Sequence, residues 1–460
     1  MSRRTRHAKS RRRRTLNQKS RKRRKRRPSL SYRESLVEAI RNFFPWQFFS
    51  RWKLRRGLQW TPQRIFWIAI LMTWSAEQTL RERFDAVRES VQALFPRWHL
   101  GETYTGWYEA QAAWLPQLQP ALTKRLQQQM RDMAGRCWTR EGWCAFAGDG
   151  SRVECPRTAA NEEELGCAGK KRTCPQLFLT TLWHMGTGLP WDFRIGPGTD
   201  SERRHLEDML PQLPPKALVV ADAGFVGYDF FQRIGAAGKH FLVRVGANVR
   251  LLQKLGYAER EGPTTVYLWP ENRSQGAPVV LRLIVLAQGK KKMYLVTNVL
   301  DETALSKKTA AILYEMRWGV EVFYRSTKQT LQRRRMLSHT PDAANYELTW
   351  TVFGVWLLGL MSVSGILERG GDPLSWSVAK ARQRVRRAMR RATTTRRCRE
   401  SLSAELGHAI KDNYVRQGSK KARDWPHKKK EGPPGYPEIK LANPHQVRAA
   451  QRHRKKRTAA

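Results

Sequence analysis

Residues 216–238 read KALVVADAGFVGYDFFQRIGAAG, and this stretch decides the class of fold. An apolar run ends at Asp222, a turn through Ala223-Gly224 follows, and the rest reads as a helix. The next apolar run, HFLVRVG (240–246), reads as a further strand. A strand, a helix and a second strand in this order indicate an α/β layer.

The segments before this unit also read as strands. CAFAGDGSRVEC (144–155), QLFLTTLWHM (176–185) and LPWDFRIG (189–196) are short apolar runs, and the last two can form a hairpin through Gly186-Thr187-Gly188. A helix capped by Ser201 then leads into the central unit. Consecutive strands followed by a βαβ unit predict a mixed sheet with flanking helices.

The segments after the central unit change character. Residues 247–300 hold three strand-like runs separated by turns rich in Gly and Lys, which predicts a β-rich insertion. Residues 306–332 predict one long helix. Residues 348–367 carry no charge and are long enough to span a membrane, but their Thr, Ser and three Gly residues favour a buried core helix.

Residues 30–135 read as helical, with Thr61-Pro62 as a cap and first-turn pair. Helix, turn and helix in a basic setting are compatible with a DNA-reading module and equally with an ordinary helical bundle. We predict five parts of the chain: a basic disordered arm (1–29), a helical region that can contact DNA (30–135), an α/β domain that includes the β-rich insertion (140–368), a basic helical region (369–416) and a basic disordered tail (417–460).

The charge balance points to a polyanionic partner. The 460 residues include 86 Lys and Arg against 39 Asp and Glu, a formal net charge of +47. So large an excess repels itself unless a polyanion neutralises it, and nucleic acid is the first candidate. An anionic membrane surface and an RNA-rich assembly are the alternatives.

The six cysteines allow two interpretations. Three of the four residues Cys155, Cys167, Cys174 and His184 can be arranged as a zinc site. We favour unpaired thiols in a reducing cytosol, because structural zinc sites usually have tighter ligand spacing and no C-x-x-C pair occurs. We expect no signal peptide, because no apolar segment follows the basic N-terminal residues.

Isolated acids beside apolar segments suggest metal-dependent phosphoryl transfer. Asp149 and Asp222 each follow a strand, and Glu321 lies in the middle of the predicted long helix. Carboxylates suit Mg²⁺, and two such ions can activate a nucleophile and stabilise the leaving oxygen. Each acid also has an ordinary explanation: a turn residue, a helix cap, or a partner for Arg317 or Arg325 one helical turn away.

The stretch YEMRWGVEVFYRSTK (314–328) makes the sequence recognisable. It contains the spacing Y-x2-R-x3-E-x6-K, and GDGSRV (148–153), ADAGF (221–225) and LVTNVL (295–300) precede it. In these residues the chain resembles the DDE transposases of bacterial insertion sequences, in the branch that carries this signature. The resemblance covers roughly residues 140–350.

The resemblance implies an RNase H-like fold whose β-rich insertion lies between the second Asp and the Glu. It implies that Asp149, Asp222 and Glu321 are catalytic and bind two Mg²⁺ ions, with Mn²⁺ as a substitute. Water activated there cleaves DNA at the element's end, and the freed 3′-hydroxyl attacks target DNA. The residues that contact DNA are then Tyr314, Arg317, Trp318 and Lys328.

The helical spacing agrees with these roles, because positions three, four and seven apart share one helix face. Arg can bind a phosphate through two donors, and Lys supplies a point charge. Trp318 can stack on a flipped base or belong to the core, and both options stay open.

The expected partners are double-stranded DNA, both element ends and target, and a second copy of the chain in a homodimer on DNA. We expect a cytoplasmic protein associated with the bacterial nucleoid and no membrane contact. Two alternatives remain: a non-catalytic DNA-binding protein derived from a transposase, and an RNase H-like nuclease without strand transfer. The sequence leaves open the end sequence, the target preference, the cut-and-paste or copying route, and a hairpin intermediate.

Overall fold

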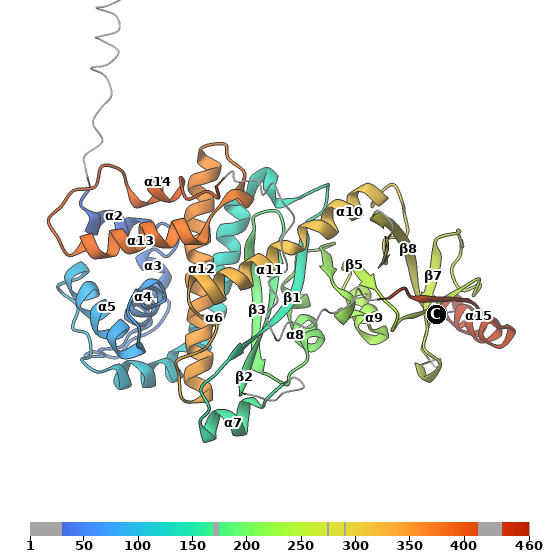
Figure 1. Cartoon of the computed structure of the whole chain (residues 1–460), viewed down its shortest axis with the longest axis horizontal. Helices are drawn as coiled ribbons and strands as arrows, with labels where there is room; N and C mark the ends of the chain where they lie inside the picture. Colours follow the sequence, from blue (N-terminus) through green and yellow to red (C-terminus); the bar gives the residue numbers. More distant parts are fainter. Residues whose placement is uncertain (1–29, 169–173, 274–275, 289–290, 413–434, 460) are drawn as a thin grey trace, which may run out of the picture.

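The computed structural model describes residues 30–168, 174–273, 276–288, 291–412 and 435–459. The arm predicted over residues 1–29 and the first part of the predicted tail lie outside the described residues. Figure 1 shows helices gathered at one end of the molecule and a long sheet running away from them.

The first described part of the chain is all-helical. Its helices are α2 (Tyr32–Arg41), α3 (Trp46–Phe49), α4 (Pro62–Trp74), α5 (Leu80–Leu94) and α6 (Tyr104–Ala134). Side-chain caps start four of them. Ser31 and Thr79 form capping boxes with Glu34 and Glu82, Thr61 accepts from the Arg64 N–H, and Thr103 accepts from the Gly106 N–H. The predicted all-helical N-terminal region is confirmed.

The described strands form one ten-stranded sheet. They are β1 (Ala145–Glu154), β2 (Gln176–His184), β3 (Leu189–Pro197), β4 (Leu218–Ala221), β5 (His240–Val245), β6 (Arg250–Gln253), β7 (Thr265–Leu268), β8 (Val279–Gln288), β9 (Lys291–Thr297) and β10 (Glu438–Leu441). Their spatial order is β10-β6-β7-β8-β9-β5-β4-β1-β2-β3.

The strand directions define the fold class. β1, β2 and β3 are antiparallel neighbours, whereas β4 pairs parallel with β1, and β5 pairs parallel with β4. This mixed sheet of β3-β2-β1-β4-β5 with flanking helices is the RNase H-like core that the resemblance implies, and the prediction is confirmed. The β-rich insertion continues the same sheet, because β9 pairs antiparallel with β5.

The remaining helices surround this sheet. They are α7 (Ala159–Leu165), α8 (Glu202–Met209), α9 (Tyr228–Ala236), α10 (Lys307–Met316), α11 (Trp318–Arg325), α12 (Pro341–Glu368), α13 (Val378–Ala392), α14 (Leu402–Leu406) and α15 (Pro444–Ala459). The single long helix predicted over 306–332 is wrong in detail. It consists of α10, α11 and a π-helical turn, Ser326–Thr330, although the Arg317 backbone between α10 and α11 stays helical.

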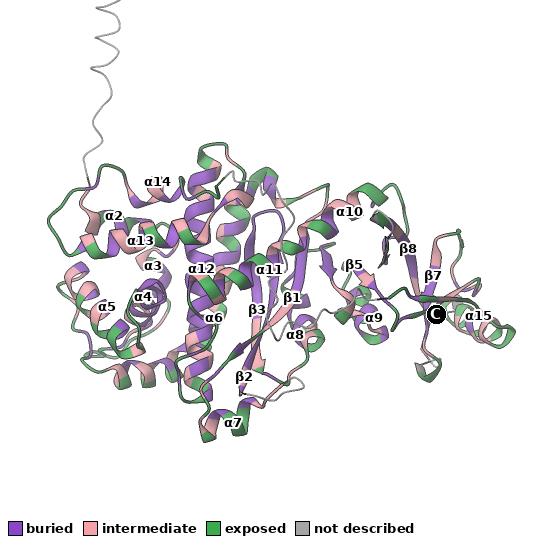
Figure 2. Ribbon diagram, viewed as in Figure 1, coloured by how far each residue is buried: buried purple, intermediate pink, exposed green. Residues whose placement is uncertain are grey.

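Helix α12 is mostly buried inside the molecule (Figure 2). It is the one helix in the described residues long and apolar enough to cross a membrane, and 89% of its apolar window is buried inside the structure. The Trp74 indole N–H donates to the Gly354 carbonyl at 3.1 Å, so α4 packs directly on α12. A β-carbon at position 354 would lie 2.5 Å from the Thr73 methyl group, which explains the glycine there.

The disordered tail predicted over 417–460 is wrong for its second half. Residues 438–441 form β10, which pairs parallel with β6, and α15 follows. Ala450 on α15 is fully buried, and the His453 ring lies against Trp269. A few apolar contacts and one strand pairing therefore hold a segment whose composition alone predicts disorder.

The zinc interpretation of the cysteines finds no support. His184 is buried, its Nδ1 accepts from the Thr187 N–H at 3.2 Å, and its Nε2 lies 3.1 Å from the Trp138 carbonyl. Both ring nitrogens are therefore engaged by the chain itself. Among the described residues, no three His, Cys, Asp or Glu side chains are grouped as ligands of a metal ion.

Candidate active site

Strands β1 and β4 place the two aspartates at the same edge of the sheet. The parallel pairing aligns Ala147 with Val220, and each aspartate comes two residues later. β4 ends at Ala221, directly before Asp222, whereas β1 continues past Asp149 to Glu154. The prediction that Asp149 follows a strand is therefore wrong: Asp149 lies within β1, level with the end of β4, and the parallel register brings the two aspartates side by side. The Asp222 Oδ1 also accepts from the Ala223 N–H at 2.8 Å, so the predicted capping role and the site role coexist.

Helices α10 and α11 bring three of the predicted residues to this edge. The Tyr314 hydroxyl donates to the Asp222 Oδ1 at 3.2 Å. The Arg317 Nη2 donates to the Glu321 Oε1 at 3.2 Å and lies 3.7 Å from the Asp222 Oδ2. Arg317 is only 5% exposed, so one buried guanidinium joins two of the three acids.

Tyr324 is a further residue of the site that the sequence interpretation missed. Its hydroxyl donates to the Asp149 carbonyl at 2.6 Å and lies 3.3 Å from the Leu179 carbonyl. It thereby fixes the backbone that carries Asp149. Tyr324 comes three residues after Glu321 and lies on the same side of the helix, which could have indicated a place in the site. It was missed because a tyrosine at this spacing is equally typical of a core residue.

Burial and neighbouring charges shift the pKa values of the ionisable groups at this edge. Burial raises the pKa of Asp149 to about 6, the Arg317 charge opposes this, and the Glu321 and Asp222 charges add to it. Burial also raises the pKa of Glu321. Burial alone would lower the pKa of Arg317, but Tyr314 and the acids around it raise it overall.

Lys328 and Trp318 occupy different settings. Lys328 lies on the π-helical turn, where burial lowers its pKa and the charges of Glu154 and Asp149 oppose that shift. Trp318 is 56% exposed, so the interpretation of Trp318 as core is wrong. Its role as a DNA contact stays a prediction.

The donor chemistry fits divalent metal ions, whereas the present side-chain arrangement is closed by an arginine. Asp149, Asp222 and Glu321 offer the hard oxygen ligands that Mg²⁺ prefers. Three half-buried carboxylates face one cation, Arg317. Burial raises the pKa of Asp149 and of Glu321, Arg317 opposes both shifts, and the neighbouring acids add to them. Arg317 lies between Asp222 and Glu321, and in this arrangement the three acids, like the other described acids, are not grouped as ligands of one ion. Arg317 would have to move aside before Asp222 and Glu321 could bind the same ion.

Comparison with known proteins assigns this part of the chain. The family described as "Transposase DDE domain" matches residues 144–358. Residues 144–358 form a transposase DDE domain. All seven residues singled out from the sequence lie inside the DDE domain.

Curated relatives of the DDE domain are transposases of insertion sequences. The chain is 26% identical over 227 residues, 46% of its length and 50% of the relative's, to "Transposase InsG for insertion sequence element IS4" of Escherichia coli (strain K12). It is 20% identical over 185 residues, 39% of its length and 52% of the relative's, to "Putative transposase for insertion sequence element IS4SA" of Synechocystis sp. (strain ATCC 27184 / PCC 6803 / Kazusa). The chain spans about half the length of the curated relatives it matches.

Among solved structures, the chain is similar to a piggyBac transposase in a synaptic complex with hairpin DNA. The identity is 11% and the TM-score 0.41, over 85% of this chain and 88% of the other.

Proposed function

We propose that this protein is a transposase that binds the ends of its element, cleaves DNA phosphodiester bonds there and joins the 3′ ends to target DNA. One observation carries the proposal: in a DDE domain, Asp149 on β1 lies beside Asp222 at the end of the parallel strand β4, and the buried Arg317 contacts both Asp222 and Glu321. A molecule that only binds DNA gains nothing from acids gathered in the path of phosphates.

The three acids are proposed to hold two Mg²⁺ ions, or Mn²⁺ in their place. When bound, such ions activate a water or hydroxyl nucleophile and stabilise the leaving oxygen. Two neighbouring tyrosines set the positions of the aspartates: Tyr314 donates to the Asp222 carboxylate, and Tyr324 holds the Asp149 backbone. These contacts limit the motion of the acids before DNA arrives.

The cations of the same helices are proposed to bind the phosphate next to the scissile bond. Arg317, once released from Asp222 and Glu321, can present two parallel donors to a phosphate. Lys328 adds a point charge one π-helical turn further along. The exposed Trp318 indole offers a flat face on which an unpaired base can stack.

The proposal extends to the assembly. Pairing two element ends requires two active sites, so we propose a homodimer on DNA. The excess of basic residues makes double-stranded DNA the partner, and its affinity should fall steeply as salt rises because phosphate contacts release counterions.

The test is a cleavage assay on DNA that carries the two ends flanking the gene, with Mg²⁺ or Mn²⁺. Wild type is compared with Asp149→Asn, Asp222→Asn and Glu321→Gln, which keep side-chain size and remove charge. Glu163→Gln, an exposed acid on α7, is the matched control.

We expect nicking at the element boundary in wild type and in the control, and none in the other three variants, with DNA binding retained in all. Added target DNA should become joined to the freed 3′ end. Cleavage without joining would favour the nuclease alternative. Binding without metal-dependent cleavage in wild type would favour the non-catalytic DNA-binding protein.

A further inference from the structure

A fourth carboxylate, that of Glu202, approaches the same edge of the sheet. Glu202 is the first residue of α8, directly after the Ser201 cap. A β-carbon at position 150 would lie 2.6 Å from its Oε1, and one at position 224 would lie 3.8 Å from its Oε2. The carboxylate therefore lies between the residue that follows Asp149 and the turn that follows Asp222.

Two glycines permit this close approach. Gly148 and Gly150 flank Asp149. Alternate residues of a strand point to the same face of the sheet, so Gly148 and Gly150 share one face. A β-carbon at position 148 would lie 3.1 Å from a Leu206 methyl group, and one at 150 would meet Glu202. The glycines thus let α8 lie directly on β1. A β-carbon at position 150 would lie 2.6 Å from the Glu202 Oε1 and 2.7 Å from the Phe178 ring, so both would have to move.

A hydrogen-bonded chain fixes α8 in this place. His205, one turn after Glu202, has its Nδ1 2.9 Å from the Thr180 Oγ1 and its Nε2 2.9 Å from the Asp200 Oδ2. Thr180 lies on β2 directly opposite Gly150. The first turn of α8 is therefore tied to the strand pair that carries Asp149.

Two acids, Asp149 and Asp222, and one arginine, Arg152, act on the charge of Glu202. Among the described residues, no Lys, Arg or His nitrogen lies within ion-pair distance of its carboxylate, and the residue is half-buried. Burial and then the Asp149 charge raise the pKa of Glu202 to about 7, and the Gly150 amide lowers the pKa of both acids. Both carboxylates are thus near one backbone N–H, and burying such a charge is costly unless a cation joins it.

We propose that Glu202 is a fourth carboxylate ligand of the divalent metal ions held by Asp149, Asp222 and Glu321. The inference rests on the proposed function, since it concerns the same site. Four carboxylates carry a charge of −4, which matches two divalent ions, and Arg317 remains free to neutralise a DNA phosphate. Glu202 reaches the site from α8, whereas Glu321 reaches it from α11, so ligands arrive from separate helices.

The experiment measures Mn²⁺ binding to the full chain by isothermal titration calorimetry and the Mn²⁺-induced rise in melting temperature. The variants are Glu202→Gln and, on the same helix, the exposed Asp208→Asn as a control. Asp222→Asn reports on the proposed function. Circular dichroism without metal verifies that each variant is folded.

We expect Glu202→Gln to weaken Mn²⁺ binding by about tenfold or more and to reduce the melting shift, while Asp208→Asn leaves both unchanged. A folded Glu202→Gln protein that binds Mn²⁺ like wild type overturns the inference; if Asp222→Asn still loses binding, the proposed function stands alone. Wild type that binds no Mn²⁺ overturns both. If Glu202→Gln does not fold, Gly150→Ala, which displaces the same carboxylate, provides the readout, and unchanged Mn²⁺ binding there overturns the inference.

Discussion

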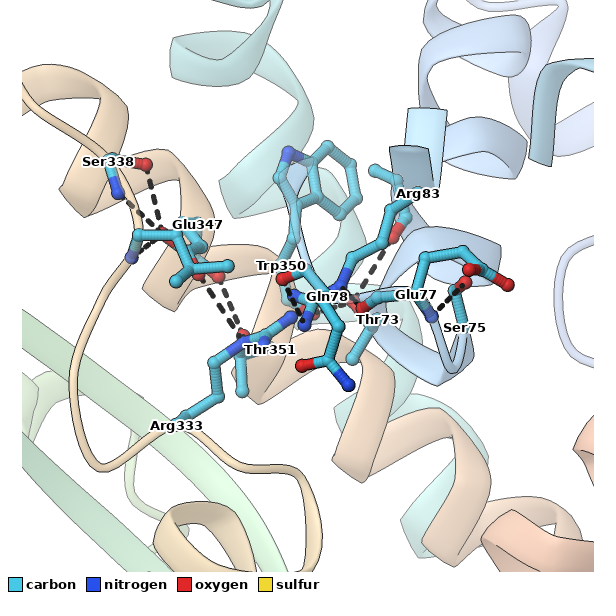
Figure 3. A network of polar contacts seen from close by, with 12 residues as sticks. Thr73, Ser75, Glu77, Gln78, Arg83, Arg333, Ser338, Glu347, Trp350 and Thr351 are labelled. Atoms are coloured by element: carbon cyan, nitrogen blue, oxygen red, sulfur yellow. Dashed lines mark hydrogen bonds and ion pairs between the residues drawn. The ribbon is translucent and has the colours of Figure 1, made fainter. Parts of the chain in front are cut away.

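Replacing Glu347 by Gln tests how helix α12 is held to the loop that precedes it. Glu347 on α12 lies 3.5 Å from the Arg333 Nε, and both side chains are 5% exposed. Its other oxygen accepts from the Leu337 N–H at 2.9 Å and from the Ser338 N–H and hydroxyl at 3.2 Å and 2.9 Å (Figure 3). One carboxylate therefore neutralises a buried arginine and orders the loop before α12.

The magnitude follows from what the substitution leaves behind. Without the Glu347 charge, Arg333 is a buried cation with no neighbouring acid, and Arg83 lies near enough to repel it. Burial already lowers the pKa of Arg83 to about 10, and Glu347 is the main charge that opposes this shift. Breaking a buried pair costs about 3–5 kcal/mol. Gln keeps an oxygen that can accept from the loop, so we expect about 3 kcal/mol, the lower end of that range.

The assay is urea unfolding of the full chain, followed by tryptophan fluorescence. Glu162→Gln is the control, because its pair with Arg157 is 66% and 39% exposed. We expect that control to change the free energy of unfolding by no more than about 0.5 kcal/mol. Equal unfolding midpoints for Glu347→Gln and the control would refute the reasoning. The double change Arg333→Met with Glu347→Leu should lose less than Glu347→Gln alone, because it removes both members of the pair together and also the repulsion between Arg333 and Arg83.

Three further predictions concern single side chains. Burial lowers the pKa of His184 from 6.5 to about 4. Between these two pH values unfolding takes up a proton, so the folded state loses stability as the pH falls. His184→Gln should reduce this pH dependence of the unfolding free energy by up to about 1.4 kcal/mol per pH unit, measured as urea midpoints at pH 5 and 7. Tyr324→Phe should cost about 1 kcal/mol and lower cleavage about tenfold, because the Asp149 backbone loses its donor; unchanged cleavage would count against this positioning role. Trp318→Ala should weaken binding to element-end DNA by about 1–3 kcal/mol in a gel-shift titration without changing stability, and Leu300→Ala, at a site 48% exposed, should change neither.

Local patterns were sufficient to predict the core and most of the site. Asp149 and Asp222 each come after an apolar run, and the resemblance predicted that they share a site; the parallel pairing of β1 with β4 brings them together. The spacing from Arg317 to Glu321 predicted their contact, which the structure contains. These features depend on neighbours in sequence or on one strand pairing.

Other features depend on packing that no local pattern encodes. Glu202 reaches the site only because α8 lies on the glycines beside Asp149, and its sequence context shows nothing but a helix start. The π-helical turn at Lys328 interrupts a segment of good helical spacing. The predicted disorder of the tail failed because strand β10 is stabilised by β6, which lies far away in sequence.

That pairing of β10 with β6 also has a consequence for the order in which the molecule is made. Every acid proposed for the site, and the whole of α12, is synthesised before residues 438–441 leave the ribosome. Until then β6 presents unpaired N–H and C=O groups at the end of a long sheet, and such an edge is a template for association with other chains. A chain cut short between α12 and β10 would therefore carry a complete set of candidate catalytic residues on a body prone to aggregate. β10 pairs with β6 late and then forms the edge of the sheet itself, and it carries Glu438 and Lys440, charged residues of the kind that protect an edge from further pairing.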